Sequence, residues 1–290
     1  SLSTEVTDED LANAWTDEFG VKYSKDRKRL VRGNLELKTY NIKEGTLAIC
    51  DAAWGWGPLK TYNLQNIQIP TSVKIIGAKA FSGCENLQSI DLPESVISIG
   101  DRAFSGCESL QSINIPASVT SIGAEAFCDC KSLQSINIPE SVNSIGERVF
   151  SGCNIQEIKI NSRYFIVDNS CLFDSLKHKL ICCYKTNIIE YTIPDFVTSI
   201  GEGVFSWCES LQSINIPASV TSIGDNAFSW CKSLQSINIP ASVMAIGDNA
   251  FSNCKSLQSI NLPESVTAIG DCAFLGCESL QSINIPASVT

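Results

Sequence analysis

Histidine is almost absent from this sequence, and its absence limits the chemistry that the chain can perform. His178 is the only histidine among 290 residues. A histidine-dependent catalytic triad or a histidine-rich metal site would therefore have at most one of its usual members. No Cys-x-x-Cys motif or Cys/His cluster occurs, which disfavours a zinc site. We predict no catalytic residues, no metal and no cofactor, with His178 a solvated loop residue.

Basic charge and long apolar runs are also scarce. The chain has 31 acidic and 21 basic residues, a net charge of −10. An acidic surface repels phosphate backbones, so nucleic acid is not expected as a partner. No run approaches the roughly 18 apolar residues that a membrane helix needs, so we expect no membrane span. Residues 1–20 lack the basic-then-apolar pattern of a signal peptide.

The sequence is dominated by a repeat with a period of 23 residues. The segment that starts at Leu110 reads LQSINIPASVTSIG, and it recurs nearly verbatim from Leu211, Leu234 and Leu280. Self-similarity at a short fixed period predicts a solenoid whose coils stack on their neighbours. Because Thr290 stops partway through a repeat, we expect the chain to be a piece of a longer protein, and we expect it to be a monomer.

One repeat contains a short strand and a series of turns. Ile90 and Leu92 alternate around a polar residue, as in a half-buried strand. Pro93 follows at once and ends the strand, because it has no N–H to donate and its φ angle is fixed. Phe104 and Cys107 then close the coil on its far side. A single coil buries too little apolar surface to offset the entropy of ordering its backbone, so the coils must stack.

A cysteine and a serine each recur at a fixed position of the repeat. Eight of the fourteen cysteines stand three residues after a repeat phenylalanine: Cys84, Cys107, Cys130, Cys153, Cys208, Cys231, Cys254 and Cys277. We predict a ladder of buried free thiols rather than bridges between coils, because parallel side chains give poor disulfide geometry. A matching ladder of serines, from Ser95 to Ser288, is expected to satisfy backbone groups at the turn. Cys182 and Cys183 are expected to pack on opposite faces of a strand.

The pattern LxxIxIPxSVxxIGxxAFxxC resembles the BspA-like leucine-rich repeat family, closely over about residues 64–153 and 194–290. The resemblance implies an α/β-type leucine-rich repeat solenoid that is mostly β with irregular turns. It implies a right-handed curved coil, with a parallel sheet on the concave side and short strands and turns on the far side. It also implies a surface-associated protein of host-dwelling anaerobic bacteria or of some protists, with a role in adhesion.

Two stretches interrupt the period and resemble each other. Val21 to Val31 parallels Cys171 to Ile181, and each reads as a β-hairpin. The first copy is expected to cap the N-terminal end of the solenoid. We predict four segments: 1–60, a cap with a short helix, a hairpin and a first irregular repeat; 61–153, regular repeats; 154–193, an irregular repeat with a hairpin insertion; and 194–290, regular repeats that end mid-repeat.

A binding surface is sought where the repeat changes. The outward strand positions carry Ser and Asn in nearly every copy, which either keeps the sheet soluble or binds a repetitive polar ligand weakly. Trp207 and Trp230 stand at a turn position where the other copies have Gly, Asp or Asn. They either pack against the hairpin or each other, or form an exposed aromatic platform. Four residues of the nearby irregular segment join them as candidates: Lys159, Arg163, Tyr164 and Phe165.

The sequence therefore favours a non-catalytic recognition module, an adhesin-like protein that binds a host or cell-surface protein or glycan. Such a module is expected at the cell surface or in secreted form. The alternative is an intracellular, cytoplasmic scaffold for protein–protein interactions, which abundant reduced cysteines would suit. A third option is an enzyme whose catalytic domain lies beyond Thr290, with this array as its targeting arm.

Overall fold

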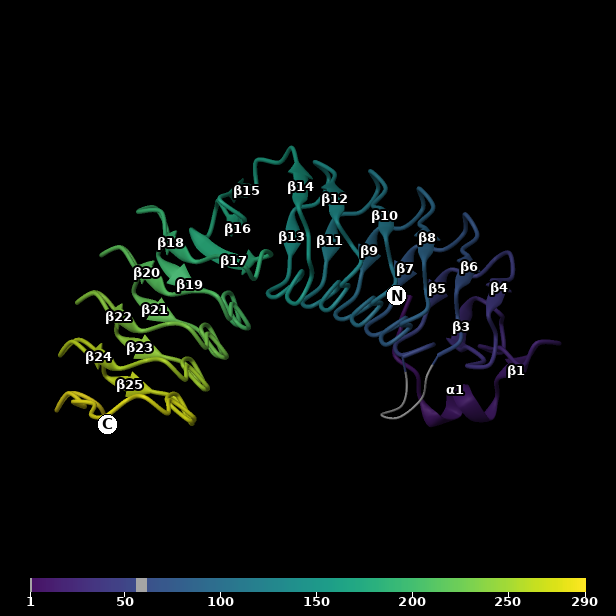
Figure 1. The fold of residues 1–290 in the computed structure, drawn as a ribbon. Coiled ribbons are helices and arrows are strands. Elements are labelled where there is room, and N and C mark those ends of the chain that lie inside the picture. Colours follow the sequence, from purple (N-terminus) through teal and green to yellow (C-terminus); the bar gives the residue numbers. More distant parts are fainter. Residues whose placement is uncertain (1, 56–61) are drawn as a thin grey trace. The chain divides into compact units, whose positions relative to one another are not determined.

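The computed structural model describes residues 2–55 and 62–290, and it divides the chain into two compact units. The first unit is Ser1–Arg163 and the second is Tyr164–Thr290. Both consist of short strands joined by turns, and α1 (Asp8–Ala12) is the one α-helix of the described residues (Figure 1). The division falls inside the irregular segment 154–193, whereas the expected boundary at 60/61 lies outside the described residues.

Each coil of the first unit contributes a strand to two separate ladders. The first ladder is an eight-stranded sheet in which an antiparallel part, β1 (Trp15–Thr16), β2 (Lys22–Tyr23) and β3 (Arg29–Arg32), continues into a parallel part. The parallel part is β5 (Ala48–Ile49), β7 (Ile75–Ile76), β9 (Ser98–Ile99), β11 (Ser121–Ile122) and β13 (Ser144–Ile145). The second ladder contains β4 (Thr39–Asn41), β6 (Asn66–Gln68), β8 (Ser89–Asp91) and β10 (Ser112–Asn114), followed by the pair β12 (Ser135–Ile138) and β14 (Glu157–Ile160).

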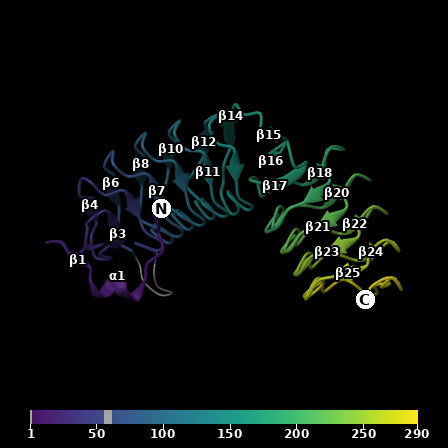
Figure 2. The same ribbon diagram turned by 180° about the vertical axis from the view of Figure 1, so that it is seen from behind.

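The second unit repeats this plan (Figure 2). Its seven-stranded sheet begins with antiparallel β15 (Phe165–Asp168), β16 (Cys171–Asp174) and β17 (Lys179–Cys183). The parallel strands β19 (Ser199–Ile200), β21 (Ser222–Ile223), β23 (Ala245–Ile246) and β25 (Ala268–Ile269) follow. The other ladder is formed by β18 (Glu190–Thr192), β20 (Ser213–Asn215), β22 (Ser236–Asn238) and β24 (Ser259–Asn261), which pair two by two. The predicted mostly-β parallel solenoid and both predicted hairpins are confirmed.

The two strands of each coil arise from different features of the sequence. In the Ser-Ile-Asn strands the central residue is buried and its neighbours are exposed, as the alternation predicts. The Ser–Ile strands that follow the proline turn have only two residues, too few to show a period, so alternation does not predict them. Short strands outside the concave sheet are expected only from the family resemblance. A glycine ends each of these strands because the neighbouring coil approaches closely: a Cβ on Gly100 would lie 2.6 Å from the Ala78 nitrogen.

The apolar core of each unit contains a column of stacked aromatic rings with thiols beside it. Phe81, Phe104, Phe127 and Phe150 stack at centroid distances of 5.4 to 5.9 Å, and Phe205, Phe228, Phe251 and Phe274 stack at 5.2 to 5.5 Å. All eight ladder cysteines are free thiols. Six of them donate to the carbonyl of the phenylalanine one coil earlier, as Cys254 Sγ does to Phe228 O at 3.1 Å. The predicted thiol ladder is therefore confirmed.

The predicted serine ladder is also confirmed, with one exception. Ser118 Oγ donates to Val96 O at 2.6 Å, and the same bond recurs at 2.6 to 2.7 Å from five other copies: Ser95, Ser141, Ser242, Ser265 and Ser288. The hydroxyl of Ser219 is buried without a hydrogen-bond partner among the described residues. These bonds join each coil to the one before it, so they add a polar ladder to the apolar stack.

The expectation for Cys183 was incomplete. Cys171 and Cys183 form a disulfide between β16 and β17, while Cys182 is a buried thiol outside this bond. Cys171 and Cys183 are direct cross-strand partners in this antiparallel pair, so their side chains lie on the same face and can bond. The position of Cys183 on its own strand shows that it faces away from Cys182, but it does not show which residue lies opposite on the neighbouring strand.

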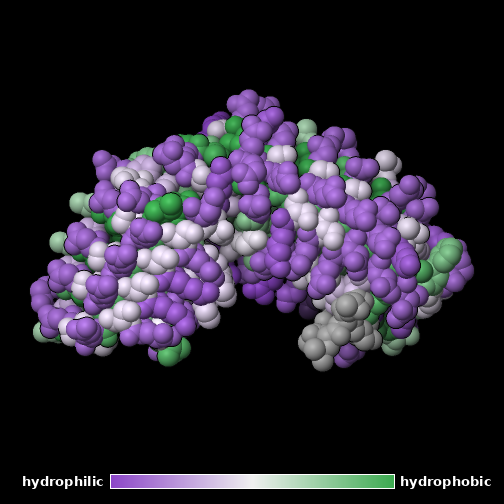
Figure 3. Space-filling model, in the orientation of Figure 1, coloured by the Kyte–Doolittle hydropathy of each residue, from purple (hydrophilic) through white to green (hydrophobic). Residues whose placement is uncertain are grey.

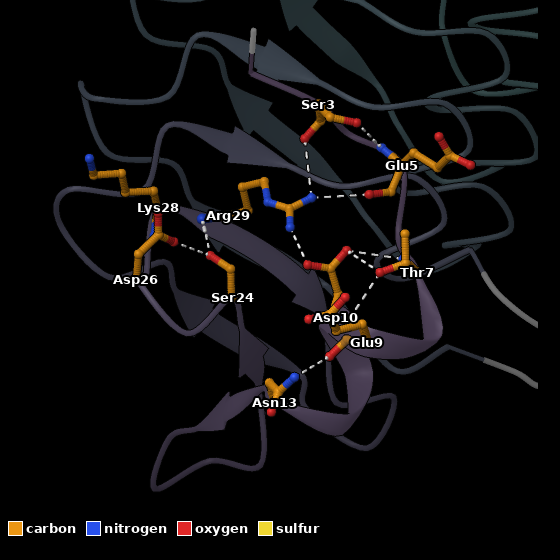
Figure 4. Close-up of polar contacts among 10 residues, drawn as sticks. All are labelled: Ser3, Glu5, Thr7, Glu9, Asp10, Asn13, Ser24, Asp26, Lys28 and Arg29. Atoms are coloured by element: carbon orange, nitrogen blue, oxygen red, sulfur yellow. Dashed lines mark hydrogen bonds and ion pairs between the residues drawn. The ribbon is translucent and has the colours of Figure 1, made fainter.

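The predicted short helix is present and is held to the first unit by Arg29 (Figure 4). Thr7 caps α1, because its hydroxyl accepts a hydrogen bond from the Asp10 N–H at 3.1 Å while the Asp10 carboxylate accepts from the Thr7 N–H at 3.0 Å. Arg29 on β3 makes an ion pair with Asp10 and donates to Glu5 O at 3.0 Å. The helix buries no residue of its own, so these polar contacts fix its position.

Candidate functional site

Trp207 and Trp230 occupy a turn position that requires left-handed backbone. Their φ angles are 66° and 63°, and the equivalent residues of the other coils also have positive φ: Gly83, Gly106, Asp129, Gly152, Asn253 and Gly276. Glycine adopts this conformation freely, whereas a residue with a bulky side chain loses about 1–2 kcal/mol there. Tryptophan at this position is therefore a local cost that the fold itself does not require.

The two indoles stack face to face. Their ring centroids are 4.6 Å apart and their planes differ by 4°. Trp207 is 44% exposed, Trp230 is half-buried, and no further ring of the described residues stacks on Trp207. The two indoles thus contact each other, as one of the alternatives from sequence states, and they also present ring surface to solvent. We refer to Trp207 and Trp230 as the indole stack.

The backbone beneath the indole stack is held by hydrogen bonds. Trp207 N–H donates to Ser229 O at 2.9 Å and Trp230 N–H donates to Ser252 O at 2.8 Å. The side chains of Ser206 and Ser229, both buried, join at 2.9 Å between Oγ atoms. The backbone of each tryptophan is thus anchored to the coil that follows it.

An ion pair lies beside the indole stack. Lys232 Nζ is 2.8 Å from Glu209 Oε1 and 5.5 Å from the centre of the Trp230 ring. The lysine therefore makes a cation–π contact while its charge is balanced by the carboxylate. The surface combines an apolar ring face with one donor group and one acceptor group. No cluster of three or more potential metal ligands occurs in the described parts of the chain.

The match to known sequences covers nearly all of the repeats. The family model of the BspA type leucine rich repeat region matches residues 59–179 and 177–290, with six copies. The chain belongs to the BspA-type leucine-rich repeat family. No curated protein matches the chain significantly.

Three solved structures have the same fold as this BspA-type chain. A leucine-rich cell surface protein from Faecalibacterium prausnitzii matches with a TM-score of 0.65 and 24% identity, over 92% of this chain and 93% of its own. The pneumococcal vaccine antigen PcpA matches with a TM-score of 0.68 and 20% identity, over 95% of this chain and 82% of its own. A leucine-rich repeat protein from Eubacterium ventriosum matches with a TM-score of 0.54 and 23% identity, over 78% and 80%.

The other four candidate residues of this BspA-type protein are divided between the two units. Lys159 on β14 is exposed, 3.6 Å from Glu157, and it belongs to the first unit together with Arg163. Tyr164 and Phe165 belong to the second unit, as the indole stack does. Phe165 is only 3% exposed, so its side chain packs in the core and is not available to a ligand. Tyr164 is half-buried beside Phe165, with a ring distance of 6.5 Å.

Two exposed aromatic residues, Phe19 and Phe196, are not found by the sequence pattern. Phe19 is 51% exposed in the turn between β1 and β2, next to a hollow of about 730 Å³. Hydrophilic residues cover much of the face drawn in Figure 3. The signal was present in the sequence, since a phenylalanine before Gly20 stands where a tight turn normally has polar residues. Residues 1–60 were interpreted only as a cap.

Proposed function

We propose that this protein is a non-catalytic recognition module of a bacterial cell surface, and that it binds a protein or glycan ligand as a monomer through the indole stack. The observation that carries the proposal is the position of Trp207 and Trp230: two indoles stand in left-handed turns where the other copies have small residues, and Trp207 is 44% exposed. Residues held in an unfavourable backbone conformation cluster at functional sites. Tryptophan also dominates the energy of many binding interfaces.

The chemistry of the indole stack suits a ligand that has one flat, weakly polar face. The open face of Trp207 can continue the stack with an aromatic side chain or with the C–H face of a sugar ring. Glu209 and Lys232 can then exchange their mutual ion pair for hydrogen bonds to polar groups at the ligand's edge. The outward Ser and Asn side chains of the neighbouring strands supply only polar contacts, so the indoles provide the anchoring part of this site.

A location at the cell surface is supported by the disulfide between Cys171 and Cys183, because disulfides persist in oxidising compartments. The solved relative from Faecalibacterium prausnitzii is described as a cell surface protein. No helix of the described residues is long and apolar enough to cross a bilayer.

The free thiols that suit the cytoplasmic alternative are compatible with an oxidising compartment. Ten of the twelve free thiols are buried. Burial raises the pKa of Cys208 and of Cys254 to about 12, which keeps these thiols protonated and unreactive.

The proposal is tested with the double variant Trp207→Gly/Trp230→Gly. Glycine is the residue of four equivalent positions and removes the backbone cost, so the melting temperature should be unchanged or raised. We expect binding to immobilised matrix proteins or to a glycan array to fall at least tenfold. Met244→Thr is the matched control, since Met244 is 55% exposed in the same unit and Thr221 and Thr267 are its equivalents.

Unchanged binding by the double tryptophan variant would rule out the indole stack as the ligand site. Failure of the wild-type protein to retain any matrix protein or glycan would count against the surface-recognition function.

A further inference from the structure

Phe19 is held rigidly in an exposed position. Its N–H donates to Asp17 Oδ1 at 2.9 Å, and the Val21 N–H donates to the same oxygen at 2.9 Å. Its carbonyl accepts a hydrogen bond from Asn34 Nδ2 at 2.8 Å. An exposed aromatic residue in a mobile turn would lose much entropy on binding, whereas a fixed one loses little. The turn therefore presents Phe19 as a preorganised apolar anchor.

A buried polar network fixes Asp17 itself. The side chain of Asp17 is fully buried and accepts a hydrogen bond from the hydroxyl of Tyr40 on β4. The Tyr40 hydroxyl lies 2.7 Å from the Tyr23 hydroxyl. Burial raises the pKa of Tyr40, so the phenol stays protonated and remains a donor to Asp17. The network joins the turn to β4, and so it sets the position of Phe19 relative to that strand.

A hollow of about 730 Å³ lies between Phe19 and the outer surface of β4 and β6. Its lining includes Thr39, Asn41, Gln68 and Pro70. Volumes of this size hold ligands of several tens of atoms, and an aromatic wall with a few polar groups is typical of binding sites. We refer to this space as the Phe19 hollow.

β4, which contributes Thr39, Tyr40 and Asn41 to the lining of the hollow, has an unpaired edge. Among the described residues, β4 is the outermost strand of its sheet and pairs with β6 alone. Lys38 O accepts from Asn66 N–H and Ile42 N–H donates to Gln68 O, so Lys38 and Ile42 face β6. Backbone groups alternate in direction along a strand, so Thr39 and Asn41 direct their N–H and C=O groups to the side that has no partner strand. This open edge offers two donors and two acceptors in the register of a β-strand.

Two exposed carboxylates lie at the hollow, Glu44 in its lining and Glu18 beside Lys43. Lys43 is the one basic residue of the lining, and it is paired with Glu18 at 2.6 Å. A complementary ligand therefore carries positive charge close to an apolar group.

We propose that the Phe19 hollow binds an extended peptide segment of a partner protein, which adds as a strand to the open edge of β4. An apolar side chain of the segment packs against Phe19, and a basic side chain contacts Glu18 or Glu44. Strand addition takes its affinity from main-chain hydrogen bonds and its specificity from side-chain pockets. The alternating free groups of Thr39 and Asn41 match a peptide backbone and have no such counterpart in a saccharide. This site lies in the first unit and does not depend on the indole stack.

The test uses a display library of random decapeptides selected against the full chain. Enriched peptides are expected to combine an apolar and a basic residue at nearby positions. A synthetic copy of the leading peptide should protect the amides of Thr39 and Asn41 from hydrogen exchange. Its affinity should fall at least tenfold for Phe19→Ser and stay within twofold for Ile97→Thr, because Ile97 is 47% exposed in the same unit and Thr120 is its equivalent.

The main-chain contact is tested by N-methylation of two alternate amides of that peptide. Methylation removes backbone donors without changing the side chains, and we expect at least a tenfold loss of affinity. Equal binding of the methylated peptide, equal binding by Phe19→Ser, or no enrichment in the selection overturns the proposal. A glycan that binds in a Phe19-dependent way, with no peptide that does so, also overturns it and assigns the hollow to a saccharide.

Discussion

The two solenoid units begin with the same three-stranded antiparallel module, but different side chains stabilise it. In the first unit β2 and β3 pair with a bulge between Lys22 and Tyr23, and in the second β16 and β17 pair with a bulge between Leu172 and Phe173. Both modules then continue into a parallel ladder through their third strand, β3 or β17. The backbone of the module, including its bulge, is thus the same in both units, whereas the side-chain contacts that stabilise it differ.

The first module uses a buried polar network. Asp17, Tyr23 and Tyr40 are joined by hydroxyl hydrogen bonds, and Lys43 N–H donates to the Tyr23 hydroxyl at 3.2 Å. Trp54 fills the space beside Gly33, since a Cβ on that glycine would lie 2.1 Å from the indole ring. A side chain at position 33 is therefore excluded by packing.

The second module replaces this network with a covalent bond. Phe173 stands where the first module has Tyr23, so one hydroxyl is missing, and Tyr191 corresponds to Tyr40. The smaller ring of Phe205 stands where the first module has Trp54, which leaves room for the side chain of Cys183 at the place of Gly33. The comparison teaches that strand pattern and bulge define this module, and that either hydrogen bonds or a disulfide can stabilise it.

Among the changes that distinguish the two modules, removal of the disulfide should lower stability the most. A cross-link that closes a loop of this size, with a sequence separation of 12, stabilises a protein by about 3 kcal/mol. We expect Cys171→Ser/Cys183→Ser to lower the free energy of unfolding of the second unit by about that amount and to leave the first unit unchanged. Hydrogen exchange resolved by peptide, read separately for the two units, measures both. Equal loss of protection in both units would contradict the assignment, and reductant-treated wild-type protein is the control.

Tyr40→Phe should have the next largest effect, confined to the first unit. The substitution removes the hydroxyl that donates to the buried Asp17 and contacts Tyr23. Loss of a partner from a buried polar group costs about 1–3 kcal/mol. Urea unfolding monitored by peptide-level hydrogen exchange should show this loss in residues 2–55. If stability is unchanged, the network does not hold the turn that carries Phe19.

Acid should weaken the first module by a smaller amount. The hydrogen bond from the Thr7 backbone, with the Thr7 hydroxyl and Arg29, holds the pKa of Asp10 below its ordinary value. A lowered pKa in the folded state stabilises the protein above the unfolded pKa of about 3.9, and this stabilisation is lost as pH falls through the lower folded value. A helix cap contributes about 1 kcal/mol, so we expect no more than that. Exchange of the α1 amides should rise between about pH 4 and 2 in the wild type.

Asp10→Asn is the control for this pH effect, because it cannot titrate and should show no such rise. An identical pH dependence in that variant would assign the effect to another carboxylate.

The regular coils could be predicted from sequence almost residue by residue, because 23-residue periodicity places Phe104, Cys107 and Ser118 at known positions of every coil. The β-hairpin of each module could also be predicted, because the two hairpin sequences resemble each other. Strands β1 and β15 were missed because Trp15–Thr16 and Phe165–Asp168 show no repeat of the other coils. The disulfide and the Phe19 hollow were missed because both depend on side chains brought together from different strands, which a linear pattern does not encode.

The arrangement of the indole stack, too, could be predicted only in part from the sequence. The spacing of Trp207 and Trp230 by one period predicts that they lie together, and they do. Whether they share a plane or stack depends on side-chain torsions at a left-handed turn, which the spacing does not determine. The burial of Phe165 likewise follows from its place at the start of β15, a strand that the sequence pattern does not show.

Tyr191→Phe should have the smallest effect, and it gives the sharpest contrast with Tyr40→Phe. The Tyr191 hydroxyl is buried and has no hydrogen-bond partner among the described residues, whereas the Tyr40 hydroxyl has two. A buried hydroxyl without a partner lowers stability, so its removal should leave the free energy of unfolding of the second unit unchanged or raise it by less than about 1 kcal/mol. The same chemical change at equivalent positions thus has opposite expected signs. A destabilisation of more than about 1 kcal/mol would mean that the second module, too, depends on a polar contact of its tyrosine, and that the disulfide is an addition to such a network and not its replacement.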